Sequence, residues 1–212
     1  RQYIAADQEN INDMEFLDVD SDDDLDAVSL SMVSDRVEWY ANNGSMVFGG
    51  PNLAAEPPTT TNTFTAGDLD GDGDPDLAYE LSGSDGFTWL ANDGTGTFSV
   101  AQVIDSIDVY GLTAADPDGD GDDDLVGNHS FYLDLRWYEN DGSGQLQPAE
   151  SIADNNQSLW GMLDVNDDGL SDLMFYSTGT ARYSPGLGAG QFGEPEEIFL
   201  PGFDTNFITW GD

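Results

Sequence analysis

The 212-residue chain contains no cysteine, no lysine and only one histidine, and its basic side chains are four arginines. Without cysteine there are no disulfides and no thiolate zinc sites. Without basic clusters, nucleic acid and anionic membranes are poor partners. No apolar run approaches the ~18 residues that would allow membrane insertion. No stretch keeps a helical period, and glycine and proline interrupt the chain throughout, which favours an all-β fold.

Aspartate is what the chain has in excess. It recurs on alternate positions in four nine-residue frames, which begin at Asp18, Asp68, Asp116 and Asp164. Carboxylates this close repel by about 1 kcal/mol per pair in water, and by about 4 kcal/mol at an effective dielectric near 20, so each frame requires a cation. Hard oxygen donors without cysteine or histidine favour Ca²⁺ over zinc, and flexible loops favour it over Mg²⁺. We therefore expect about four Ca²⁺ ions, one per frame.

Within a frame, we expect positions 1, 3, 5 and 9 to offer side-chain oxygens and position 7 a backbone carbonyl. Leu170 at a seventh position supports main-chain ligation there. The predicted ligands are Asp18, Asp20, Asp22, Asp24 and Asp26; Asp68, Asp70, Asp72, Asp74 and Asp76; Asp116, Asp118, Asp120, Asp122 and Asp124; and Asp164, Asn166, Asp168, Leu170 and Asp172.

The sixth position should adopt a positive φ, which suits the glycines found there in three frames. The first frame has Asp23 instead, and the fourth has Asn166 in place of a carboxylate, so we expect both to bind more weakly. An EF-hand is disfavoured, because no frame has the glutamate required at position 12. The alternative is that these are merely acidic, solvated loops, which four copies in one register make improbable.

The frames follow one another at intervals of 50, 48 and 48 residues, a period that is typical of propeller blades. Apolar segments precede the frames at 14–17, 64–66, 112–115 and 159–163, and others follow at 25–33, 77–81, 125–126 and 173–176. Next come aromatic segments ending in Asn-Asn-Gly or Asn-Asp-Gly turns, with a divergent copy after Tyr183. The fourth strands should run through Phe48, Phe98, Leu146 and Phe192.

These motifs resemble the FG-GAP/VCBS repeats, the calcium-binding blades that also form the propeller of integrin α subunits. The resemblance depends on Ala66-Gly-Asp-Leu-Asp-Gly-Asp-Gly-Asp-Pro-Asp-Leu77 and on the Trp-x-x-Asn-x-Gly turns, and it covers nearly the whole chain. The Gly-Ala-Pro that follows the integrin motif is missing, so integrin-like partner binding is not inferred. The resemblance implies a β-propeller of four-stranded antiparallel blades.

The repeat predicts one propeller region with blades at 13–55, 62–105, 110–153 and 159–199. Residues 1–8 would end a preceding blade, and 206–212 would be the first strand of a fifth. We therefore expect a fragment of a larger propeller of seven or eight blades. The alternative is a four-bladed ring with loose ends.

No catalytic constellation is evident. His129 has no partner in the sequence that would make it a base, and the most conspicuous aspartates are assigned to metal. Trp39, Trp89 and Trp137 share one repeat position, which favours packing between blades over sugar stacking. Trp160 and Trp210 on first strands leave the same two possibilities open.

The formal net charge is −39, and four Ca²⁺ ions would neutralise only a small part of it. This predicts a marine or halophilic source, where salt screens self-repulsion. Calcium sites of roughly 0.1 to 1 mM affinity fit an extracellular or cell-surface location. The leading hypothesis is a non-catalytic recognition or adhesion module with a glycan or protein ligand. The alternatives are the propeller of a larger secreted enzyme, such as a polysaccharide lyase, and a structural spacer.

Overall fold

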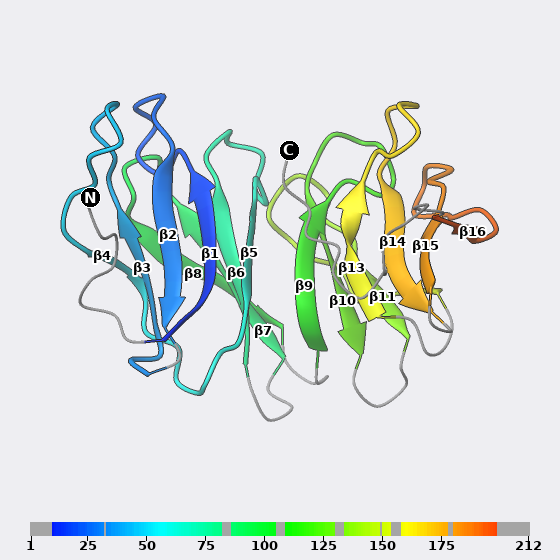
Figure 1. Ribbon diagram of the computed structural model, residues 1–212, viewed down its shortest axis with the longest axis horizontal. Helices are drawn as coiled ribbons and strands as arrows, with labels where there is room; N and C mark the ends of the chain where they lie inside the picture. Colours follow the sequence, from blue (N-terminus) through cyan, green and yellow to red (C-terminus); the bar gives the residue numbers. More distant parts are fainter. Residues whose placement is uncertain are drawn as a thin grey trace.

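The computed structural model describes residues 10–31, 33–81, 86–104, 109–129, 134–148, 150–153, 158–177 and 180–198. These residues form sixteen strands in four separate antiparallel sheets, each of four strands (Figure 1). The described residues contain no helix, and hence none that could cross a membrane. The prediction of an all-β propeller built from four-stranded blades is confirmed. The predicted end segments, 1–8 and 206–212, lie outside the described residues.

Each blade is a meander in which consecutive strands pair. Blade 1 contains β1 (Ile11–Leu17), β2 (Asp26–Ser31), β3 (Arg36–Tyr40) and β4 (Asn52–Ala55). Blade 2 contains β5 (Phe64–Gly67), β6 (Asp76–Glu80), β7 (Phe87–Asn92) and β8 (Phe98–Ile104). Blade 3 contains β9 (Val109–Ala115), β10 (Asp124–His129), β11 (Leu135–Tyr138) and β12 (Glu150–Ala153). Blade 4 contains β13 (Ser158–Leu163), β14 (Asp172–Ser177), β15 (Thr180–Ser184) and β16 (Glu196–Glu197).

The fourth strands are shorter than the sequence predicts. Only β8 begins at the predicted aromatic residue, Phe98. Phe48 and Phe192 form isolated bridges, to Asn42 and Gly186, and Leu146 lies outside any strand. The prediction was wrong for blades 1, 3 and 4, where the residue after the turn bridges back to the turn or is buried at it before the chain pairs as a strand; Phe48 and Leu146 are the buried examples.

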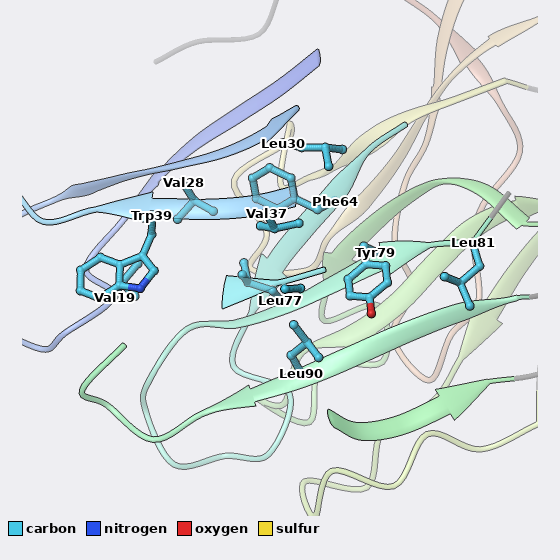
Figure 2. Close-up of a cluster of buried hydrophobic side chains, with 11 residues drawn as sticks. Val19, Val28, Leu30, Val37, Trp39, Phe64, Leu77, Tyr79, Leu81 and Leu90 are labelled. Carbon is cyan, nitrogen blue, oxygen red and sulfur yellow. The ribbon is translucent and has the colours of Figure 1, made fainter. Parts of the chain in front are cut away.

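The apolar core lies between blades, as expected for a repeat whose units cannot bury both faces alone. One cluster joins blades 1 and 2: Val28, Leu30 and Val37 from blade 1 meet Phe64 and Leu77 from blade 2 (Figure 2). Equivalent clusters lie between blades 2 and 3, around Phe87 and Tyr138, and between blades 3 and 4, around Leu135 and Phe175.

Two sets of connections meet at one edge of the blades, the upper edge in Figure 1. The acidic loops, residues 18–26, 68–76, 116–124 and 164–172, join first to second strands. The outer turns, residues 42–48, 92–98, 140–146 and 186–192, lie between third and fourth strands. In an antiparallel meander these connections fall at the same end of the sheet, so the acidic loops and outer turns are brought together.

Candidate metal centres

The first aspartate of each acidic loop organises the backbone. Asp18 accepts the amide N–H groups of Asp22 and Asp23, both at 3.0 Å. Asp68, Asp116 and Asp164 make the same pair of bonds to the fifth and sixth residues of their loops. The chain therefore wraps around this carboxylate, and the alternating side chains converge on the loop interior.

The wrapping requires positive φ at two positions. The sixth residue has φ of 69°, 92°, 100° and 89° at Asp23, Gly73, Gly121 and Gly169, which confirms the prediction for that position. The fourth residue is also left-handed, with φ of 56° at Ser21 and 61° at Asp167, and glycine in the other two loops. Sequence reasoning missed this second position, although Gly71 and Gly119 were a visible sign of it.

The ninth aspartate closes the loop. Asp76 is fully buried; its Oδ2 accepts the N–H of Leu69 at 3.0 Å and its Oδ1 that of Asn92 at 2.8 Å. Asp26 and Asp172 make the equivalent bonds. In blade 3, Asp124 accepts the amide of Asn140 and the indole N–H of Trp137. The ninth carboxylate thus ties the acidic loop to the outer turn of its own blade, a role that sequence reasoning did not anticipate.

In three sets of carboxylates, the oxygens that could bind a metal ion lie within 4.8 Å of one another. They are Asp18, Asp20 and Asp22; Asp68, Asp70 and Asp76; and Asp116, Asp118 and Asp120. In the fourth loop, Asn166 offers an amide oxygen at the third position, which already accepts the N–H of Asp168. The structure therefore brings together predicted ligands from positions 1, 3 and 5 or 9.

These carboxylates fit a hard cation. One oxygen of Asp20 and one of Asp70 are buried without a hydrogen-bond donor among the described residues. Burial and then the neighbouring carboxylates raise the pKa of both side chains, and burial raises the pKa of Asp118. Burial also raises the pKa of Asp76 and Asp124 to about 7. A divalent cation would supply the missing partner and the opposing charge.

The seventh residue behaves differently from its neighbours. The carboxylates of Asp24, Asp74 and Asp122 lie over Gly44, Gly94 and Gly142 of their own outer turns, so closely that a Cβ at the glycine would clash. The seventh side chain is therefore directed at the outer turn. This arrangement is compatible with ligation by the seventh backbone carbonyl, which stays a prediction.

The first three acidic loops are also held by the outer turn of the next blade. Asn92 donates its side-chain N–H to Val19 O at 2.9 Å, and Asn140 donates to Leu69 O at 2.7 Å. At the third junction, Ala189 donates its backbone N–H to Asp118 O at 3.0 Å. Val19 is fully buried as a result, whereas Val165, at the same position in the fourth loop, is 43% exposed. Three of the four loops are thus parts of blade junctions.

The repeated tryptophans pack at these junctions, as predicted. Trp39, Trp89 and Trp137 are buried, and each indole lies against a glycine in the outer turn of the following blade: Gly96, Gly144 and Gly190. Trp39 also donates its indole N–H to Gly96 O at 3.2 Å. These side chains are not available for sugar stacking. Trp210 lies outside the described residues.

His129 lies on β10 with 3% of its surface exposed, and its Nδ1 is 3.4 Å from Asp134 Oδ1. Asp134 in turn forms an ion pair with Arg136 at 2.9 Å. This supports the interpretation that His129 is a packed residue and not a catalytic base.

Comparisons with known proteins agree with this architecture. Residues 18–79 match the family of FG-GAP-like repeats, which confirms the predicted resemblance over that segment. A search of curated proteins gives no match. A solved structure of an Agrocybe aegerita lectin that specifically recognises non-reducing terminal N-acetylglucosamine is similar in fold, with a TM-score of 0.67 and 22% sequence identity. The similarity covers 87% of this chain and 51% of the lectin chain, so the chain spans about half the lectin's length.

Proposed function

We propose that the chain is a non-catalytic propeller that recognises glycans and depends on Ca²⁺ for its shape. The observation that carries the glycan part is the fold shared with a lectin that recognises terminal N-acetylglucosamine. His129 is packed beside Asp134, which is ion-paired with Arg136, and this supports a binding function over a catalytic one.

The calcium part of the proposal is supported by the buried oxygens of Asp20 and Asp70 that have no hydrogen-bond donor in the part of the chain that the structure describes. Each acidic loop bonds both to the outer turn of its own blade and, at three junctions, to that of the next. A cation that fixes the loop would therefore fix the spacing of adjacent blades and of the surface between them. The ion would be structural, as in extracellular modules with affinities of roughly 0.1 to 1 mM. We infer an extracellular or cell-surface location on that basis.

A glycan array tests the proposal directly. The protein is applied in 5 mM CaCl₂ and, in parallel, after EDTA treatment, to glycans that end in N-acetylglucosamine and to the same glycans capped by galactose. We expect calcium-dependent binding to some glycans on the array, with preference for the uncapped forms. Absence of binding to every glycan at saturating calcium would favour the spacer hypothesis. Binding that is unchanged in EDTA would contradict the structural role of the ion.

A further inference from the structure

A cavity of about 300 Å³ lies where the first strands of all four blades converge. Its walls come from β1, β5, β9 and β13, and therefore from residues far apart in the sequence. This volume is at the lower end of the range of small-molecule sites, which is roughly 300 to 1,000 Å³. The cavity is separate from the acidic loops, which lie at the edge of the blades.

Two carboxylates, those of Asp13 and Glu15, face this cavity from β1, and only Asp13 has hydrogen-bond donors among the described residues. Asp13 accepts the N–H of Met14 at 3.0 Å, the hydroxyl of Thr63 at 2.7 Å and the N–H of Phe64 at 3.2 Å. Glu15 accepts no hydrogen bond from any described residue, and burial followed by the charge of Asp13 raises its pKa to about 7. Glu15 is thus a partly buried acid that faces the cavity and has no hydrogen-bond donor among the described residues.

No lysine or arginine side chain among the described residues lies beside Glu15 in the cavity. The chain has no lysine, and no arginine lines the cavity. Arg36 is paired with Glu56 at 2.6 Å, and Arg136 with Asp134 at 2.9 Å. Among the described residues, therefore, no basic side chain balances the charge of Glu15.

The remaining walls indicate which cation fits. Trp160 lines the cavity from β13, and its indole is stacked on Tyr176, with centroids 5.8 Å apart and planes 24° from parallel. Thr113 on β9 also lines it. An aromatic face beside a carboxylate attracts ammonium groups, and threonine hydroxyls bind the hydroxyls of a ligand. A bare metal ion fits less well, because the oxygens of Asp13 are already engaged and the cavity is much larger than an ion.

We propose that this axial cavity binds a primary ammonium group carried by a hydroxylated molecule of sugar size, with Glu15 as its anionic partner and Trp160 as its aromatic wall. The site is formed by the inner strands and by Thr63, and it includes no residue of the acidic loops or of the outer turns.

Isothermal titration calorimetry with a matched pair of probes tests this site. The probes are 1-amino-1-deoxy-D-glucitol and D-glucitol, which differ by one ammonium group, titrated into calcium-saturated protein at pH 8, where both the ammonium and the Glu15 carboxylate are charged. We expect the amine to bind at least tenfold more tightly than the alditol. Glu15→Gln should weaken the amine at least tenfold, Trp160→Leu should weaken it severalfold, and the exposed control Glu194→Gln should leave it unchanged.

The proposal is overturned if the amine does not bind, if D-glucitol binds equally well, or if Glu15→Gln binds the amine like the wild type. It is also overturned if Glu15→Gln loses one calcium ion per chain, since the cavity would then be a metal site. A melting curve for each variant verifies folding. Glycan-array binding by Glu15→Gln should match the wild type, so failure of this site and failure of glycan recognition are distinguishable.

Discussion

The metal hypothesis can be tested at single carboxylates, and the carboxylate at the third position of the acidic loop provides the most direct test. One oxygen of Asp70 is buried without a hydrogen-bond donor among the described residues. One carboxylate oxygen each of Asp68, Asp70 and Asp76 lie within 4.8 Å of one another, so the three could share one cation. Asp70→Asn keeps the size of the side chain and removes one charge. We expect calcium titration of the EDTA-stripped variant to show one site weakened at least tenfold and the remaining sites unchanged.

Glu194→Gln is the matched control for that substitution, because Glu194 is exposed and is not part of any acidic loop. It should bind calcium as the wild type does. Identical stoichiometry and affinity in Asp70→Asn and Glu194→Gln would show that the third position is not a ligand.

Glu15 gives the chain a pH dependence of known sign. Its pKa is raised from 4.5 to about 7, so the folded state binds the proton more tightly than the unfolded state. The stability that follows is fully present below about pH 4.5 and is lost as pH rises through 7. Asp13 is the charged neighbour that reinforces the shift. Glu15→Gln should therefore be more stable than the wild type at pH 8, by on the order of 1 kcal/mol because the group is partly solvated, and not at pH 4.5.

Denaturant unfolding of both proteins at the two pH values, without added amines, measures this difference. Glu194→Gln again serves as the control and should show no pH-dependent gain. An equal free-energy difference between Glu15→Gln and wild type at pH 4.5 and pH 8 would contradict the raised pKa.

For single residues, the sequence predicted which positions need a left-handed backbone conformation better than it predicted which groups form hydrogen bonds. The alternating aspartates and Gly73 were sufficient to predict a loop with a left-handed sixth residue. They did not reveal that the buried Asp76 holds two backbone N–H groups, because one of these, on Asn92, belongs to a strand 16 residues away. Long-range partners of this kind depend on how the strands pair, which local patterns do not encode.

At the scale of structural elements, the acidic loop and the outer turn act as a pair that spans two blades. The contact between Trp39 and Gly96 is a tight steric constraint in this pair. Gly96 has a φ of 74°, and a Cβ there would overlap the indole ring of Trp39. Gly96→Ala combines overpacking with an unfavourable backbone conformation and should lower the free energy of unfolding by roughly 2 kcal/mol or more.

Gly50→Ala provides the comparison, because no atom outside its immediate neighbours lies within 4 Å of a Cβ built at Gly50. It should change stability by less than about 0.5 kcal/mol. Thermal or urea unfolding of both variants at saturating calcium distinguishes the two sites. Equal effects would mean that the indole contact does not constrain the junction.

The strand content illustrates why some elements were predictable and others were not. The first and second strands of each blade flank the acidic loop, whose aspartate pattern is easily recognised in the sequence. These strands, β1, β2, β5, β6, β9, β10, β13 and β14, therefore lie close to their predicted positions. Fourth strands lie at the rim, where the apolar signal of Phe48 and Leu146 comes from packing on a turn. Burial alone does not distinguish that contact from strand pairing.

At the scale of the whole molecule, the dominant quantity is the formal charge of −39. Even with all acidic loops neutralised, a large negative charge would remain on the surface and would oppose compaction. We expect the melting temperature at saturating calcium to rise between about 0.1 M and 1 M NaCl, since the Debye length falls from about 10 Å to about 3 Å.

Sucrose at matched osmolality controls for effects of the solution other than screening, and it should stabilise less than the salt does. A melting temperature that does not change with NaCl would refute the inference that the source is marine or halophilic.

The blades are not interchangeable, because the first outer turn differs from the rest. Met46, with a φ of 56°, occupies the position that Gly96, Gly144 and Gly190 hold in the later blades. In a copy of blade 2 inserted between blades 2 and 3, the glycine equivalent to Gly96 would face the indole of Trp89. The tryptophan of the copy would in turn face Gly144 of blade 3. The same copy grafted ahead of blade 1 would drive its tryptophan into a methionine side chain. A blade that packs its tryptophan against the first outer turn would therefore need a contact different from the indole–glycine contact of the three described junctions, because Met46 is 70% exposed at that position.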